Sequence, residues 1–319
     1  MAENESTCGG ARALRRPPRP ATRPRRAAKS LRALSGVLVA AVCISGAGAG
    51  TRVQNGFDSA ALAPALSAAP DTRTETVVTE LEEKLPADMS VIDYGRFVLA
   101  MSASREQAMR QGRRIARADE QMREHAFPAV GSGRTIVILA ADSSALGPIA
   151  SKLYPSIAIG EMPPSGFYHQ RDRLILATTA NGEAALWAQL MQSILRDYNP
   201  HAPHWFEQAA ATLYESSDWH SGRLTPLLDR RMRDISPDED LSYDVFAGIC
   251  DCTPVSAEQL ALMRLLLVYL LRHDELKALQ AIIKEQGQYT TLLQALDALD
   301  FDHAAWKRFA EDSVRTYAR

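Results

Sequence analysis

Three polar side chains, two of them at helical spacing, are the strongest candidates for a site in this chain of 319 residues. Gln189 and Ser193 are four positions apart in a segment with a helical apolar stripe, so both fall on one face of the predicted helix, and Gln208 lies on the next one. Histidines at this spacing bind zinc, and a glutamate beside the first histidine activates water. Here Leu190 occupies that glutamate position and accepts no proton. Because amides and hydroxyls are poor zinc ligands, the pattern predicts no metal, no cofactor and no catalytic residue.

The residues around these positions form a longer set of sequence motifs. Its most specific parts are Gly166-Phe167-Tyr168 before a strand, Tyr198-Asn199-Pro200 between two helices, and Pro203-His204-Trp205-Phe206-Glu207 at the start of the second helix. In these motifs, residues 90–319 resemble the peptidase MA-like gluzincins and are most similar to the exported bacterial group DUF1570. The resemblance implies an α+β fold with a small mixed sheet, an edge hairpin, two crossing helices of the active-site type and an all-α C-terminal part.

The resemblance assigns each position of the zinc site to one residue of this chain. The first histidine falls on Gln189, the catalytic glutamate on Leu190 and the second histidine on Ser193. The glutamate ligand falls on Gln208, and Ala209 stands where a glycine is expected. A catalytic zinc site needs three protein ligands, and these positions supply none. The resemblance therefore implies a pseudoenzyme that is retained for binding or architecture.

A binding role requires a surface, and the two helices of the degenerate site offer one. We expect the cleft between residues 183–199 and 203–216 to hold an extended peptide or an envelope protein against an edge strand, Arg173 to Ala177. The candidate contacts beside this cleft are His204, Trp205, Tyr214 and Trp219.

Two other functions stay open. An active peptidase or hydrolase would need a relocated or unidentified catalytic site, for which His201, His204 and Glu207 are the nearest set. Pro200 and Pro203 interrupt the regular helix there, so these side chains do not share one face. No serine lies in a G-x-S-x-G elbow. A purely structural or domain-docking role has no residue of its own in support.

The first 49 residues predict export. Residues 12–32 carry nine basic side chains interleaved with prolines, which prevent a packed helix. An apolar run from Leu34 to Ala49 follows and ends in small residues, as a signal peptidase site requires. We interpret residues 1–49 as a signal peptide or, because the apolar run is only marginally too short to span a bilayer, as an uncleaved anchor over residues 34–49. Both interpretations place the rest of the chain in the periplasm or outside the cell.

Charge and cysteines restrict the partners of the exported part. Residues 1–49 hold nine basic and two acidic residues of the 36 and 38 in the chain, which leaves 27 basic and 36 acidic residues, a net charge of −9. This negative charge argues against nucleic acid as a partner. Cys250 and Cys252 remain, separated by Asp251. A disulfide across one residue is strained, so we expect two free or loosely paired thiols.

The remaining pattern predicts a linker followed by one domain. Residues 50–86 are rich in Ala, Pro, Thr and Ser and are predicted to be a flexible linker with one short helix near Val77 to Lys84. Residues 87–319 are the expected gluzincin-like domain, with an irregular segment beyond Gly222. Its expected strands are residues 95–101, 135–140 and a hairpin over 166–177, and its main expected helices are residues 104–125, 142–154, 183–199, 203–216, 260–271 and 304–317. Ser104 and Ser256 are predicted to be helix N-caps.

Overall fold

The computed structural model describes most of the chain from Pro70 onward. The described residues are 70–127, 133–155, 165–180, 182–228, 231–236, 241, 243–247, 249, 255–287 and 290–317, and they belong to one compact unit. The predicted signal peptide or anchor over residues 1–49 lies outside this set, as do Cys250 and Cys252. Among the helices of the described part, none combines the length and the apolar character needed to cross a membrane.

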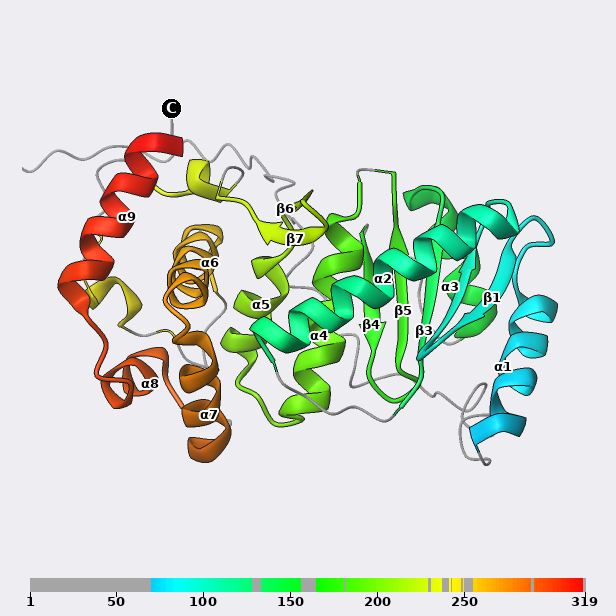
Figure 1. The fold of residues 1–319 in the computed structure, drawn as a ribbon, viewed down its shortest axis with the longest axis horizontal. Coiled ribbons are helices and arrows are strands. Elements are labelled where there is room, and N and C mark those ends of the chain that lie inside the picture. The colour runs from blue at the N-terminus through cyan, green and yellow to red at the C-terminus, as the bar shows by residue number, and fades with distance from the viewer. Residues whose placement is uncertain are drawn as a thin grey trace, which may run out of the picture. The chain divides into compact units, whose positions relative to one another are not determined.

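A mixed five-stranded sheet forms the N-terminal half of this unit (Figure 1). Its strands are β1 (Ser90–Tyr94), β2 (Phe97–Met101), β3 (Thr135–Ala140), β4 (Gly166–His169) and β5 (Leu174–Thr178), in the spatial order β1-β2-β3-β5-β4. The central strands β2, β3 and β5 are parallel, whereas β1 and β4 join the two sides as antiparallel strands. The parallel strands are covered on both faces, which is why they are continuous apolar runs such as residues 135–140.

Helices cover both faces of the sheet. Alternate residues of each strand point to opposite sides, so Val137 packs with α2 (Arg105–His125) and α4 (Ala184–Tyr198), whereas Ile138 packs with α1 (Pro70–Lys84) and α3 (Ser143–Leu153). Figure 1 shows α2 and α4 along one side of the strands. The expected helices over residues 104–125 and 142–154 are therefore confirmed, and Ser104 forms the capping box that begins α2.

The edge of the sheet differs from the prediction. We expected Arg173 to Ala177 to be an edge strand, but β5 pairs with β3 on one side and with β4 on the other. The edge strand on this side is β4, the first strand of the predicted hairpin. A hairpin pattern specifies which two strands pair with each other. It does not specify which of them inserts beside a third strand, so the sequence alone left this choice undetermined.

Helix α1 lies within the stretch predicted to be a linker. It begins at Pro70, upstream of the short helix expected near Val77 to Lys84, and it packs on the sheet through Val77, Leu81 and Leu85, which is the residue after the helix. The folded part therefore includes residues that composition alone assigned to the linker. The apolar residues of α1 are too few for composition to distinguish them from a polar connector.

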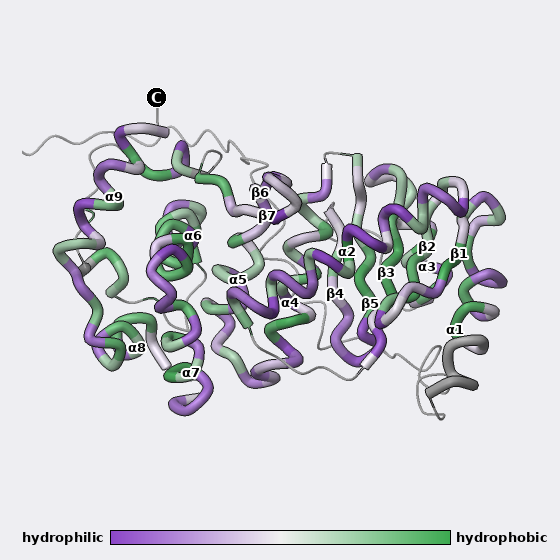
Figure 2. The backbone as a smooth tube through the Cα atoms, in the orientation of Figure 1, coloured by the Kyte–Doolittle hydropathy of each residue, from purple (hydrophilic) through white to green (hydrophobic). Residues whose placement is uncertain are grey.

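The C-terminal half is helical. It consists of α5 (His204–Leu213), a hairpin of β6 (Ser217–His220) and β7 (Arg223–Pro226), the short 3-10 helices η3 (Arg231–Asp234) and η4 (Tyr243–Phe246), and helices α6 (Ala257–Arg272), α7 (Leu276–Gln286), α8 (Leu292–Ala298) and α9 (His303–Tyr317). Helix α6 is buried along most of its length and packs against α5, α7 and α9. Figure 2 shows its strongly apolar sequence. Ser256 caps α6 as predicted. The chain is thus an α+β protein with a small mixed sheet and a helical C-terminal part.

Candidate functional site

Helix α4 places Gln189, Leu190 and Ser193 in the protein interior. It lies against β4 and β5 on one side and against α5 on another. The exposed fractions of the three residues are 3%, 1% and 0%. Burial of a leucine is ordinary, but a buried amide and a buried hydroxyl require hydrogen-bond partners.

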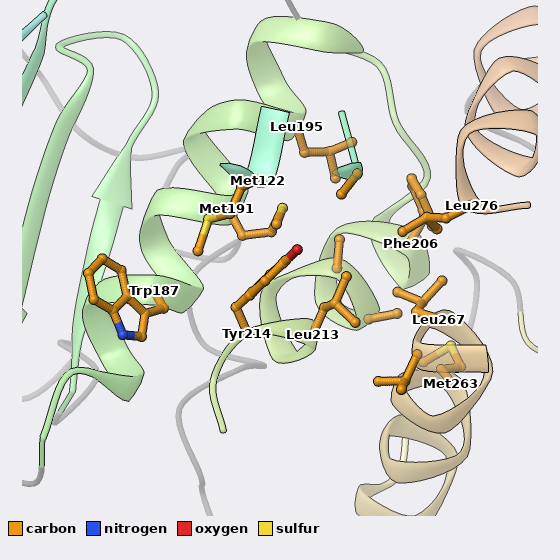
Figure 3. Close-up of a cluster of buried hydrophobic side chains, with 14 of the residues drawn as sticks. Met122, Trp187, Met191, Leu195, Phe206, Leu213, Tyr214, Met263, Leu267 and Leu276 are labelled. Carbon is orange, nitrogen blue, oxygen red and sulfur yellow. The ribbon is translucent and has the colours of Figure 1, made fainter. Parts of the chain in front are cut away.

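Buried apolar residues of α4 flank these polar groups. Met191 and Leu195 lie one turn apart on α4 and pack toward α5, from which Leu213 and Tyr214 continue the cluster toward α6 (Figure 3). This stripe explains why α4 and α5 pack together without any contribution from a metal. Apolar side chains therefore make the main contact between the two helices, and the polar positions lie beside that contact.

Tyr168 of β4 lies beside Ser193. Burial raises the pKa of Tyr168, while the positive charge of Arg173 and a hydrogen bond with Ser193 oppose that rise. Arg196 also acts electrostatically on Tyr168, as does the negative charge of Asp197. Arg173 is ion-paired with Asp197 and Arg196 with Glu207, so two carboxylates balance these two positive charges.

Gln208 lies on α5, with 8% of its surface exposed. Its Nε2 is 2.9 Å from Nε2 of His204, one turn earlier on the same helix. The neighbouring Glu207 is also buried, its Oε2 accepts a hydrogen bond from Arg196 Nη2 at 2.6 Å, and its Oε1 is ion-paired with the same nitrogen at 2.5 Å. Gln208 and Glu207 thus both have partners within the protein, and Glu207 is neutralised by Arg196 from α4.

The four candidate cleft contacts differ in how deeply they are buried. Trp205 is 1% exposed, and its Nε1 donates to the carbonyl of Thr290 at 2.8 Å. Tyr214 is also buried, and burial raises its pKa. Trp219 is half-buried, with its ring edge-on to Trp187 at 6.2 Å between centroids. His204 is also only partly buried, with 36% of its side chain exposed.

Their burial gives Trp205 and Tyr214 a structural role. Both rings fill the interior around α5, so they are not available to an extended ligand on the surface. The sequence could not separate these two cases, because buried and ligand-binding aromatic residues both follow the apolar stripe of a helix. Trp219 keeps a partly accessible ring, although the guanidinium of Arg114 lies 5.7 Å from its centroid.

A relocated metal site finds no support in the described part of the chain. No group of three or more histidine, cysteine, aspartate or glutamate side chains is arranged there to hold an ion. His201 is exposed and lies before α5, and Glu207 is engaged by Arg196.

An ionic cluster that the sequence analysis missed fixes the C-terminal end of α4. Asp197 Oδ1 accepts from Arg173 at 2.5 Å, and Asp197 Oδ2 accepts from Arg123 at 2.9 Å and from Arg96 at 3.2 Å. Asp119 of α2 accepts from Arg123 at 2.9 Å and from Arg96 at 3.4 Å. Arg96 and Arg173 each directly precede a parallel strand, and the starts of parallel strands meet at one edge of a sheet. That positional signal could have indicated the cluster.

The pKa values of the two carboxylates in this cluster are shifted in opposite directions. Burial alone would raise the pKa of Asp197, but hydrogen bonds from Arg173 and Arg123 outweigh it and lower that pKa to about 2. Burial raises the pKa of Asp119 despite the opposing charges of Arg96 and Arg123. Asp197 is therefore the carboxylate that the three arginines hold in its ionised form.

Comparison with known proteins adds no assignment. No protein-family model matches the chain, and no curated protein matches it either. The function must therefore be argued from the residues and from the geometry described above.

Proposed function

We propose that this chain is a non-catalytic, gluzincin-like protein of the DUF1570 type, exported to the periplasm or beyond, which binds an extended peptide or an envelope protein. The order of its elements supports the proposal. A mixed sheet with an antiparallel edge strand is followed by two packed helices and a helical C-terminal part.

One observation carries the non-catalytic part of the proposal. Gln189, Leu190 and Ser193 are buried together on α4, where a zinc peptidase would need two imidazoles and a carboxylate. Gln208, at the position of the third ligand, is hydrogen-bonded to the side chain of His204. An amide, an isobutyl group and a hydroxyl can neither bind zinc nor remove a proton from water.

A fourfold substitution tests the assignment of these positions. The variant Gln189→His, Leu190→Glu, Ser193→His and Gln208→Glu supplies three ligands and a general base in the expected register. We expect the variant to bind about one zinc ion per chain, as measured by elemental analysis after dialysis. A matched variant with Gln192→His in place of Gln189→His puts the first histidine on a different face of α4 and should bind far less. A correctly folded fourfold variant without zinc would show that the register is wrong.

The edge strand is the surface proposed for a peptide. Ser165 and Thr178 form a backbone hydrogen bond between β4 and β5. Since antiparallel pairs alternate, the backbone groups of Gly166 and Tyr168 point away from β5. All four residues of β4 are buried, so an extended peptide that adds a strand to the sheet has to displace what covers those groups.

Backbone methylation of the peptide tests this binding mode. Peptides selected from a random displayed library would be resynthesised with one N-methyl group at each successive position. We expect affinity to fall at alternate positions only, because every second amide of an added strand faces the sheet. Equal losses at all positions, or none at any, would contradict strand addition, and a library that yields no binder would count against a peptide partner.

A further inference from the structure

Four exposed arginines follow one another along the outer face of α2. Arg110, Arg113, Arg114 and Arg117 recur at spacings of three and four residues, which places their side chains on one side of the helix. Figure 2 shows the polar character of α2 along its length. These guanidinium groups therefore form a continuous strip on the surface of the protein.

The hairpin of β6 and β7 extends this strip. Gln121 of α2 holds the hairpin by hydrogen bonds to Gly222 and Leu224. The guanidinium of Arg117 lies against the hairpin turn, because a Cβ atom on Gly222 would come within 2.6 Å of its Nη2. The next residue, Arg223, is exposed. We call the four arginines of α2 together with Arg223 the arginine patch.

Only part of the positive charge of the arginine patch is balanced within the protein. Arg110 is ion-paired with Glu106, and Arg114 is ion-paired with Glu183. The other three arginines of the patch form no ion pair in the part of the chain that the structure describes, although Asp218 is exposed on the same hairpin. Like charges four residues apart on a helix repel each other, so these arginines do not stabilise α2. A partner with negative charge would remove that repulsion.

The size of the arginine patch indicates a short partner segment. Glu106 precedes the patch on α2, and Glu120 and Glu124 follow it, so acidic side chains bound it at both ends. From Arg110 to Arg117 the helix rises about 10 Å, which an extended peptide covers with about three residues. Residues 50–319 carry a net charge of −9, so a broad anionic surface such as a membrane would also meet acidic parts of the protein.

We propose that the arginine patch binds a short acidic segment of a partner protein, with aspartate or glutamate on about three neighbouring residues. A guanidinium group presents a planar fork of donors that matches the two oxygen atoms of a carboxylate. The surface differs from the proposed peptide site at β4. Helix α2 packs on β1 and β2, whereas β4 forms the opposite edge of the sheet. The inference is therefore independent of the proposed function.

Fluorescence anisotropy of labelled peptides with the full chain tests the proposal. The probe carries a run of glutamates, and its control carries glutamines instead. We expect only the glutamate peptide to bind, and the variant Arg113→Gln, Arg117→Gln should bind it about tenfold more weakly. The matched variant Arg308→Gln, Arg315→Gln removes two exposed guanidinium groups from α9 and should leave the affinity unchanged. The basic residues of segment 12–32 are present in every one of these proteins, so the difference between the variants isolates the patch.

Two further variants separate charge from a loss of structure. Arg113→Lys, Arg117→Lys keeps both positive charges and should retain most of the affinity. Arg113→Glu, Arg117→Glu replaces attraction by repulsion and should weaken binding about a hundredfold, with an unchanged circular dichroism spectrum. No binding by the unmodified protein, or equal affinities in the patch and α9 variants, would overturn the proposal. Phosphatidylglycerol vesicles that bind through the patch, when the glutamate peptide does not, would overturn it in favour of a lipid surface.

Discussion

Asp197 should contribute more to the stability of the protein than any surface carboxylate. Its side chain is 4% exposed and accepts hydrogen bonds from Arg96, Arg123 and Arg173, which come from a loop, a helix and a hairpin turn. Replacing it by asparagine leaves three partly buried guanidinium groups with only Asp119 as a counter-charge. Removing one member of a buried ion pair costs about 3–5 kcal/mol. The guanidinium groups keep some solvent contact, so we expect a loss of about 3 kcal/mol.

Urea unfolding at neutral pH measures this loss, with Asp93→Asn as the matched control. Asp93 also pairs with an arginine, Arg134 at 2.6 Å, but its side chain is 40% exposed. Surface pairs contribute about 0–1 kcal/mol, so the control should unfold almost like the unmodified protein. A loss of less than about 1 kcal/mol for Asp197→Asn, equal to that of the control, would refute the structural importance of the cluster.

The pH dependence of the same variant checks the sign of the effect. The Asp197 pKa is lowered in the folded protein from 3.8 to about 2. Its ionisation therefore stabilises the fold fully above pH 3.8, by about 2 kcal/mol, and this contribution is lost as the pH falls through about 2. The stability difference between the unmodified protein and Asp197→Asn should shrink over that range. A difference that grows as the pH falls would contradict the assignment of the shift to Asp197.

Two further predictions concern the helical half. Ser256→Ala removes the side chain that accepts from the backbone of Gln259, and it should lower the free energy of unfolding by about 1 kcal/mol in thermal denaturation. An unchanged Tm would show that packing alone fixes the start of α6. Trp205→Phe leaves the carbonyl of Thr290 without its indole donor and should cost about 1–3 kcal/mol in urea unfolding. Unaltered stability would contradict the anchoring of α5 by this bond.

The elements that the sequence predicted correctly are those with a strong local signal. Residues 135–140 form a continuous β-branched run, and the apolar period around Leu190 indicated α4 directly. Ser104 and Ser256 were predicted to be helix N-caps, and in the structure each forms a capping box with a glutamine three positions later.

The features that escaped prediction depend on distant residues. The hairpin of β6 and β7 is short and largely exposed, so no apolar pattern revealed it, and Gln121 of α2 holds it by bonds to Gly222 and Leu224. Arg96 meets Asp197 although 101 positions separate them in the sequence. The place of β5 between β3 and β4 likewise brings together strands whose order no local pattern specifies. Such contacts are set by the whole fold, and local spacing carries no information about them.

We propose that Gln189, Ser193 and Gln208 cannot bind a catalytic metal. Elemental analysis of the purified, unmodified protein after mild dialysis tests it most directly. We predict far less than one zinc ion per chain and no change in stability when a chelator is added. One tightly held zinc ion per chain, lost on substitution of these residues, would contradict the claim.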